Sequence, residues 1–300
     1  MPLAIADGVK LYWEDTGTAH ASTTPIIFVH EFGGDYRSWD DQMRHFGRGR
    51  RCITFSGRGY PKSDVPTDAS QYGQDLSTRD VVAVMDAAGV AKAHVVGLSM
   101  GAYTSMMVAS TFGSRVVSCV AAGGGSGSVK DSRDQFITDA RASASQMQTA
   151  GKFNAAAIGV SPTRVQLQNK DPLGWATFVK HLAEHDPVGA GNTLLKVQAM
   201  RPSLYDLETE LKAIAAPTLL LVGDEDEPCL DVNLWMKRLM PNAQLAFLPG
   251  AGHAINLEDP ALFNQLIDTF VASVERGSWR PRDPRAAFGM TGTSLGAIRS

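Results

Sequence analysis

The chain has few of the features that would place it in a specialised class of protein. Its 300 residues include only 3 cysteines, at unrelated spacings, which predict neither a disulfide framework nor a zinc site. The formal net charge of −3 gives no electrostatic basis for binding nucleic acid or an anionic membrane surface. No apolar run approaches the roughly 20 residues of a membrane-spanning helix, and the first residues lack the basic and apolar regions of a signal peptide. We therefore expect a cytoplasmic protein with reduced thiols.

What the chain does contain is a long alternation of strand-like and helix-like segments. Hydrophobic residues make up 44% of the sequence, enough for a large buried core. Short apolar runs, typical of strands buried on both faces, alternate with segments of helical period. This pattern predicts an α/β fold with a mostly parallel central sheet flanked by helices. The expected strands are Val9–Glu14, Pro25–His30, Arg51–Phe55, His94–Leu98, Val116–Ala122, Pro217–Val222 and Ala243–Leu248.

One segment, residues 126–215, interrupts the alternation. It is rich in alanine, glutamine and serine and has helical period without a buried-strand run, so we expect helices over Asp131–Gly151, Asn154–Val160, Pro172–Glu184 and Asn192–Met200. Its place in the chain predicts a helical cap or lid over the sheet; a packed helical subdomain without such a role is the alternative. The core domain then comprises residues 1–125 and 216–275, and we expect residues 276–300 to be a disordered or surface-lying tail.

The most informative motif is the pentapeptide at residues 97–101 (GLSMG), directly behind an apolar run. A serine flanked by glycines at this spacing, between a strand and a helix, is typical of a nucleophile elbow. The turn forces Ser99 into a sparsely populated backbone conformation, and the glycines let the strand and the helix nearly touch. Because this motif also occurs by chance, the prediction depends on finding an acid and a base.

Candidates for both follow in the chain, each after an expected strand. The acidic turn at residues 224–227 (DEDE) follows the run that ends at Val222, and His253 lies in a glycine-rich loop after the next run. Ligands of such sheets bind at the carboxyl ends of the strands, and all three candidate groups are expected there. The order of serine, acid and histidine is the one expected for a hydrolase with this elbow.

Four segments together resemble the α/β-hydrolase family over roughly residues 3–275. They are residues 29–34 (VHEFGG), 57–64 (GRGYPKSD), 97–101 (GLSMG) and 250–253 (GAGH). The resemblance implies that Ser99 is the nucleophile, His253 the general base and acid, and Asp226 the group that orients His253, with Asp224 as the alternative acid. It also implies an oxyanion hole formed by the backbone N–H groups of Phe32 and Met100, and it implies no cofactor and no metal.

These roles predict acyl transfer to water on a small-molecule substrate. Hydrolysis of a carboxylic ester or lactone through an acyl-enzyme is the first interpretation. Amide hydrolysis, carbon–carbon bond hydrolysis and a cofactor-free haloperoxidase reaction are alternatives on the same three residues, and a non-catalytic ligand receptor on the same fold also stays open. The acyl and alcohol specificity depends on side chains of the cap. Trp175 and Phe178 are the first candidates, and the others are Phe136, Met147, Phe153, Met200 and Tyr205. The oligomeric state is open, a homo-oligomer included.

The sequence departs from the family pattern at Glu31, where glycine usually follows the histidine. In one interpretation the Glu31 carboxylate turns outward and pairs with Arg37 or Arg58. In the other it borders the substrate pocket, favours a cationic or hydrogen-bond-donating group and repels acidic substrates. Two other histidines are assigned no catalytic role. His30 is expected to fix the oxyanion loop through a buried hydrogen bond, and His94 is expected at the surface or the sheet edge.

Overall fold

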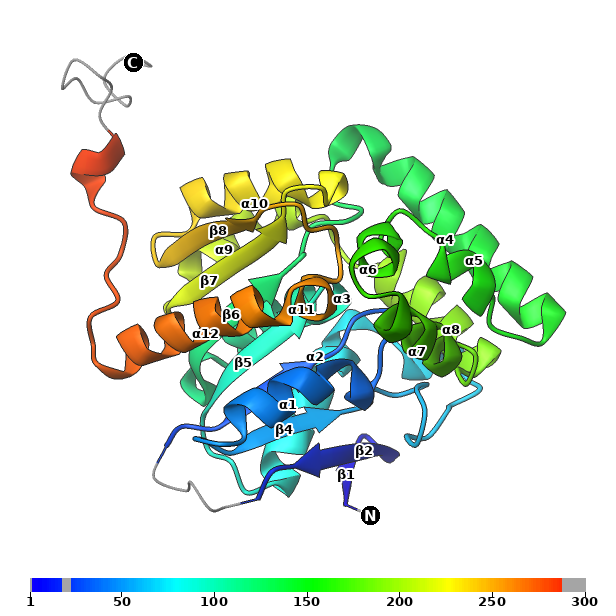
Figure 1. Ribbon diagram of the computed structural model, residues 1–300. Coiled ribbons are helices and arrows are strands. Elements are labelled where there is room, and N and C mark those ends of the chain that lie inside the picture. The colour runs from blue at the N-terminus through cyan, green and yellow to red at the C-terminus, as the bar shows by residue number, and fades with distance from the viewer. Residues whose placement is uncertain (1, 18–22, 288–300) are drawn as a thin grey trace.

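An eight-stranded sheet forms the centre of the molecule (Figure 1). The computed structural model describes residues 2–17 and 23–287. The strand order is β1-β2-β4-β3-β5-β6-β7-β8, with β1 antiparallel to β2 and β2 antiparallel to β4, and all neighbours from β4 to β8 parallel. The predicted α/β fold is therefore confirmed. The strands are β1 (Leu3–Ala6), β2 (Val9–Asp15), β3 (Ile26–Val29), β4 (Cys52–Phe55), β5 (Ala93–Leu98), β6 (Val116–Ala122), β7 (Thr218–Gly223) and β8 (Ala243–Leu248).

The central strands are buried along their whole length, which is why they appear in the sequence as continuous apolar runs. Strand β1 was not predicted, because its four residues alternate between exposed and buried positions at the sheet edge. The expected surface position of His94 is wrong. It lies on β5, fully buried between two neighbouring strands, and its Nδ1 is 2.7 Å from the Ser118 hydroxyl on β6.

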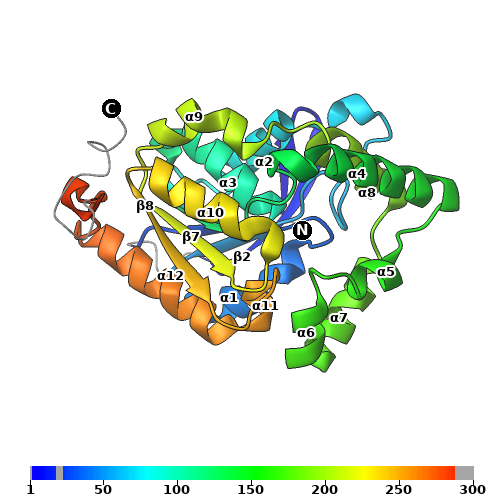
Figure 2. The same cartoon turned by 90° about the horizontal axis from the view of Figure 1, so that it is seen from above.

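Helices cover both faces of the sheet (Figure 2). On one face a hydrophobic cluster joins the sheet to α2 (Gln74–Ala87), α3 (Met100–Thr111), α9 (Glu208–Ala213) and α10 (Glu227–Leu239). On the other face a second cluster joins it to α1 (Asp40–Phe46), α11 (Ile255–Glu258) and α12 (Pro260–Glu275). In the described part of the chain, no helix combines the length and the apolar character needed to cross a bilayer.

The segment after α12 begins by packing on the core. The Trp279 ring meets Phe270 edge-on at 4.6 Å, and its Nε1 donates a hydrogen bond to the Asn242 carbonyl at 3.1 Å. The first part of the predicted tail therefore lies on the surface of the sheet domain, and a short 3-10 helix, η6 (Pro284–Ala287), follows it. Residues 288–300 of the predicted tail lie outside the described residues.

Between β6 and β7 the chain forms a group of helices with a hydrophobic core of its own. We call residues 126–215 the inserted segment. It contains α4 (Lys130–Ala150), α5 (Ala155–Gly159), α6 (Val165–Lys170), α7 (Pro172–Leu182), α8 (Pro187–Thr193), the π-helix η4 (Leu194–Gln198) and the 3-10 helix η5 (Leu204–Leu207), and it ends with α9. Figure 1 shows α4 to α8 gathered at one end of the sheet, whereas α9 packs against α3 and α10. Helix α6 was not predicted, and the expected helix over Asn192–Met200 is divided between α8 and η4.

A close contact joins the inserted segment to the sheet domain. Gly189 on α8 lies against Gly59, in the loop after β4, so closely that a Cβ on Gly189 would lie 2.1 Å from the Gly59 carbonyl oxygen. Gly59 itself has a φ of +85°. Only glycine fits this pair of positions, because any side chain on Gly189 would push the two backbones apart.

Candidate active site

Ser99 lies in a strained turn between β5 and α3. Its backbone has φ 57° and ψ −112°, outside the regions that a residue with a side chain usually adopts, and its N–H donates to the Ala122 carbonyl at 2.7 Å. The flanking glycines have no room for a side chain. A Cβ on Gly97 would lie 2.1 Å from the Gly101 carbonyl oxygen, and one on Gly101 would lie 2.0 Å from that of Val29. The predicted steric reason for the glycines is therefore present.

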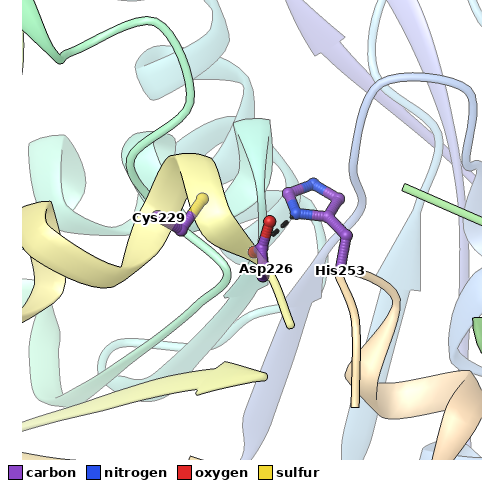
Figure 3. Close-up of side chains that lie close together, drawn as sticks. All are labelled: Asp226, Cys229 and His253. Carbon is purple, nitrogen blue, oxygen red and sulfur yellow. Dashed lines mark hydrogen bonds and ion pairs between the residues drawn. The ribbon is translucent and has the colours of Figure 1, made fainter. Parts of the chain in front are cut away.

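The structure brings Ser99, His253 and Asp226 together at the carboxyl ends of β5, β8 and β7. His253 Nε2 lies 2.8 Å from Ser99 Oγ, and His253 Nδ1 lies 2.8 Å from Asp226 Oδ2. Figure 3 shows Asp226 and His253 facing each other, joined by this contact. The alternative acid, Asp224, is exposed and accepts a hydrogen bond from the Ala251 N–H at 3.2 Å, so it holds the histidine loop rather than the imidazole.

The electrostatics of the pair favour a basic imidazole. Both side chains are buried, with exposed fractions of 3% for Asp226 and 5% for His253. Burial alone would lower the pKa of His253, but the adjacent Asp226 carboxylate outweighs this effect and raises the pKa. Because Asp226 accepts the Nδ1–H, the Nε2 lone pair is left to face the Ser99 hydroxyl. The arrangement can remove the proton of Ser99 and hold it during a reaction.

Cys229, one turn into α10, is a third group beside this pair (Figure 3). Ligand atoms of Asp226, Cys229 and His253 lie within 4.8 Å of one another, a spacing that can hold a metal ion. Burial raises the pKa of the Cys229 thiol, and its Sγ donates to the Gly123 carbonyl at 3.4 Å. The three residues therefore form a hydrogen-bonded acid–histidine pair with a protonated thiol next to it.

Two backbone N–H groups lie where the sequence predicts an oxyanion hole. Met100 is the first residue of α3, so its N–H has no acceptor within the helix, and Phe32 follows β3 in a loop that borders Ser99. Neither N–H donates a hydrogen bond to another described residue. Such free donors can receive an oxygen atom that becomes negatively charged during a reaction.

His30 fixes the loop that carries Phe32, as expected. Its Nδ1 donates to the Glu31 carbonyl at 2.7 Å, and its Nε2 accepts from the Gly57 N–H at 2.9 Å. Burial lowers the pKa of His30 to about 4, so the imidazole is neutral at physiological pH. With both ring nitrogens occupied by backbone groups, His30 ties the loop after β3 to the loop after β4.

Glu31 faces inward, so the expected outward pairing with Arg37 or Arg58 is wrong. The side chain is 1% exposed, and its Oε2 accepts from Arg164 Nη2 at 2.5 Å. Arg37 and Arg58 pair with other carboxylates instead. Arg164 comes from the start of α6 in the inserted segment, and its guanidinium lies 4.7 Å over the ring of Phe178. A buried ion pair therefore joins the two parts of the molecule beside Ser99.

A cavity of about 270 Å³ opens between Ser99 and the inserted segment. Loops of the sheet domain form one wall and helices of the inserted segment form the other. Of the expected pocket residues, Phe136 lines it, whereas the others, Trp175 and Phe178 included, do not. Trp175 donates its Nε1–H to the Gly159 carbonyl at 2.6 Å inside the helical core, and Phe178 lies behind Arg164. The lining residues are Glu31, Phe32, Ser99, Ser126, Phe136, Asp139, Ala140, Ser143, Ile158, Ser161, Thr163, Arg164, Leu194, Gln198, Arg201 and His253.

Three polar residues of this wall were not predicted from the sequence: Arg164, Gln198 and Arg201. The inserted segment contains many polar residues, and helical period alone does not show which of their side chains face the cavity. One signal was present in the sequence. A carboxylate at Glu31, inside an oxyanion loop, requires a cationic partner if it is buried. That requirement predicts an arginine or lysine nearby, but it does not say which one.

Several known proteins are similar to this chain over most of its length. The family model described as the alpha/beta hydrolase family matches residues 26–266. A 2-hydroxy-6-oxo-6-phenylhexa-2,4-dienoate hydrolase of Burkholderia cepacia is 28% identical over 280 residues, 88% of this chain and 92% of that protein. The 3-oxoadipate enol-lactonase 1 of Acinetobacter baylyi is 24% identical over 261 residues, 83% of this chain and 89% of that protein. Among solved structures, an N-acyl homoserine lactone degrading enzyme matches with a TM-score of 0.69 and 26% identity, covering 90% of this chain and 100% of that one.

Proposed function

The chain belongs to the alpha/beta hydrolase family, and on that basis we propose that it is a serine hydrolase of small-molecule carboxylic esters or lactones. The observation that carries the proposal is the pair of contacts that joins Ser99 to His253 and His253 to Asp226, each of 2.8 Å, at the base of a cavity. A hydroxyl, an imidazole and a buried carboxylate in this order form the activated nucleophile of acyl transfer.

The proposed reaction runs in two halves. Ser99 Oγ attacks the substrate carbonyl while His253 Nε2 takes the hydroxyl proton, and the oxyanion that forms accepts hydrogen bonds from the N–H groups of Phe32 and Met100. Loss of one such donor typically lowers turnover by roughly 10²–10³-fold. His253 then gives its proton to the leaving alkoxide, which departs and leaves an acyl-enzyme. Water, deprotonated by the same imidazole, attacks the acyl carbonyl and releases the acid and free Ser99.

Two similarities support an ester or lactone as the bond that is opened. One relative is named an enol-lactonase, and one structural neighbour is described as degrading a lactone. In a lactone the leaving alkoxide stays attached to the acyl group, so a single cavity can hold the whole substrate through both halves of the reaction. The cavity beside Ser99, of about 270 Å³, is of the size that a small molecule needs.

Carbon–carbon bond hydrolysis is the second candidate, and a specific relative favours it. The Burkholderia cepacia protein at 28% identity is named as a hydrolase of 2-hydroxy-6-oxo-6-phenylhexa-2,4-dienoate. That compound contains no ester or amide, so its hydrolysis must break a carbon–carbon bond, next to the 6-oxo group. Such a reaction can use the same hydroxyl, imidazole and carboxylate.

A burst experiment tests the nucleophile directly. We expect the purified protein to release a stoichiometric burst of nitrophenolate from 4-nitrophenyl butyrate, followed by slower turnover. Ser99→Ala should lower turnover by about 10⁴-fold or more and remove the burst. Ser105→Ala, which removes a hydroxyl from the same helix away from the cavity, is the matched control and should retain it.

A serine-reactive alkyl phosphonate completes the test independently of the substrate. Mass spectrometry of the digested protein should find the adduct on Ser99. A burst that survives in Ser99→Ala, or an adduct on another residue, would contradict the assigned nucleophile. If the wild-type protein shows neither burst nor adduct and hydrolyses no substrate of either class, a ligand receptor is the remaining interpretation. If the wild-type protein hydrolyses 2-hydroxy-6-oxo-6-phenylhexa-2,4-dienoate but none of a set of esters and lactones, it is a carbon–carbon bond hydrolase, the second candidate.

A further inference from the structure

Four buried polar atoms on the cavity wall have no hydrogen-bond partner among the described residues. They are Glu31 Oε1, Arg164 Nε, Gln198 Oε1 and Arg201 Nη1, and all four residues line the cavity beside Ser99. Buried polar atoms in folded proteins are nearly always paired, because an unpaired one loses its hydration without compensation. Four of the 14 such atoms in the described residues therefore belong to side chains of one cavity, where a bound ligand can supply partners.

Arg201 differs from the other three because its charge also lacks a partner. The residue is 6% exposed, and no ion pair within residues 2–17 and 23–287 includes it. Its Nη2 donates to the Ser126 carbonyl at 3.0 Å, and its guanidinium lies 4.8 Å over the Tyr103 ring. Burial lowers the pKa of Arg201 only to about 10, so the side chain stays charged at neutral pH.

The two carboxylates of the cavity lining are engaged elsewhere, and the charged side chain in contact with Arg201 is another cation. Glu31 is neutralised by Arg164, which contacts it at 2.5 Å. Asp139, the other carboxylate of the lining, is exposed at the rim and accepts a hydrogen bond from Gln135. Arg133, which donates to the Arg201 carbonyl, adds a second cation behind it. Water can satisfy the free N–H of a buried guanidinium, but it cannot supply the opposite charge.

We propose that the substrate carries a carboxylate in addition to its reacting carbonyl, and that Arg201 binds this carboxylate. The inference rests on the proposed hydrolysis at Ser99 and names its substrate class. Arg201 Nη2 donates to the Ser126 carbonyl, and the N–H groups of Nη1 are left for the carboxylate oxygens. The expectation that Glu31 would repel acidic substrates is thereby reversed, since its negative charge is already used by Arg164.

The backbone around this position is itself unusual. The helix that leads to Arg201 contains the π-helix η4, in which the Ala199 N–H bonds to the Leu194 carbonyl five residues before it. Single π-turns of this kind occur frequently at functional sites. Leu194 and Gln198 of this turn both line the cavity. Arg201 also borders an outer hollow that Lys196 lines, so the experiment must report on the side that faces Ser99.

Pairs of substrates that differ only in charge test whether the cavity beside Ser99 binds a carboxylate. The first pair is 4-nitrophenyl hydrogen adipate and 4-nitrophenyl 5-carbamoylpentanoate, with the charge on the acyl side. The second is 4-carboxyphenyl and 4-carbamoylphenyl butyrate, with the charge on the leaving group. In at least one pair, the wild-type protein should favour the acid over the amide by roughly 10- to 100-fold in kcat/KM, the range of a hydrogen bond to a charged group.

The variants decide which residue is responsible. Arg201→Gln should abolish the preference, and Arg201→Lys should restore part of it. Lys196→Gln removes a cation of the outer hollow, which does not line the cavity beside Ser99, and should keep the preference. Circular dichroism and thermal unfolding check that each variant is folded. Equal kcat/KM for acid and amide in both pairs with the wild-type protein, or a preference that survives in folded Arg201→Gln, overturns the inference.

A binding measurement separates this inference from the proposed function. Adipate and adipamide are titrated calorimetrically into the wild-type protein and into Arg201→Gln, with no turnover required. We expect adipate to bind the wild-type protein at least about 10-fold more tightly than adipamide, and Arg201→Gln to lose the difference. If no ester is hydrolysed but this difference appears, the proposed function fails and the anion site stands. If esters are hydrolysed but adipate and adipamide bind equally, the anion site is wrong.

Discussion

Buried polar groups at the sheet edge that carries Ser99 are paired with one another, whereas some of those on the inserted segment have no partner in the protein. At the sheet edge, Ser99, His253 and Asp226 satisfy one another through two contacts of 2.8 Å. Across the cavity, Gln198 and Arg201 each keep a buried atom without a protein partner. The first arrangement is complete before any substrate arrives, and the second is completed by the substrate. On the proposals above, the reacting groups belong to the sheet domain, and most of the groups that would recognise the substrate belong to the inserted segment.

The largest effect that tests this contrast is expected at the acid of the sheet edge. Asp226→Asn removes the charge that orients and stabilises the His253 imidazolium, and we expect kcat to fall by roughly 10³–10⁴-fold. Asp224→Asn, on the same loop but turned toward the Ala251 N–H, should change kcat by only a few-fold. Kinetics with a neutral nitrophenyl ester measure both. Similar losses in the two variants would mean that the acid has been assigned to the wrong residue.

The next effect concerns stability, and it compares two ion pairs that both join the sheet domain to the inserted segment. Glu31→Gln leaves Arg164 buried without a counter-charge, so the free energy of unfolding should fall by about 3–5 kcal/mol. Glu184→Gln breaks the pair with Arg37, in which the Glu184 side chain is 46% exposed, and should cost about 0–1 kcal/mol. Urea unfolding of both variants gives the numbers. Equal losses would show that the two pairs contribute alike and that burial of Glu31 carries no special cost.

The pH dependence of the reaction tests the contact between Asp226 and His253 at the sheet edge. His253 must be neutral to accept the Ser99 proton, and the Asp226 carboxylate raises its pKa. A raised pKa keeps the imidazole protonated to a higher pH, so the acidic limb of kcat/KM for a neutral ester should have its midpoint above the ordinary histidine value of about 6.5. In Asp226→Asn, burial dominates and the midpoint should fall. A wild-type midpoint below about 6.5 would contradict the assigned interaction.

The sequence predicted the sheet edge well because parallel strands impose its geometry. Ser99, Asp226 and His253 each follow an apolar run, and the carboxyl ends of parallel strands lie along one edge of the sheet. The cavity roof has no such constraint. Arg164 pairs with Glu31 from 133 residues away, and a helical period does not specify which face turns toward the site. The π-helix that carries Gln198 also leaves no distinct period in five residues. For these reasons Trp175 and Phe178 were expected at the pocket and Arg201 was not.

The smallest expected effect compares two aromatic residues of the inserted segment, one in its helical core and one in the cavity wall. Trp175→Phe removes the hydrogen bond to the Gly159 carbonyl in the helical core, so the free energy of unfolding should fall by about 0.5–1.5 kcal/mol. Because Trp175 does not line the cavity, the relative kcat/KM for esters of different acyl length should not change. Phe136→Leu alters the cavity wall and should change that order. If Trp175→Phe altered the acyl preference as strongly as Phe136→Leu, the substrate would have to reach beyond the cavity into the helical core.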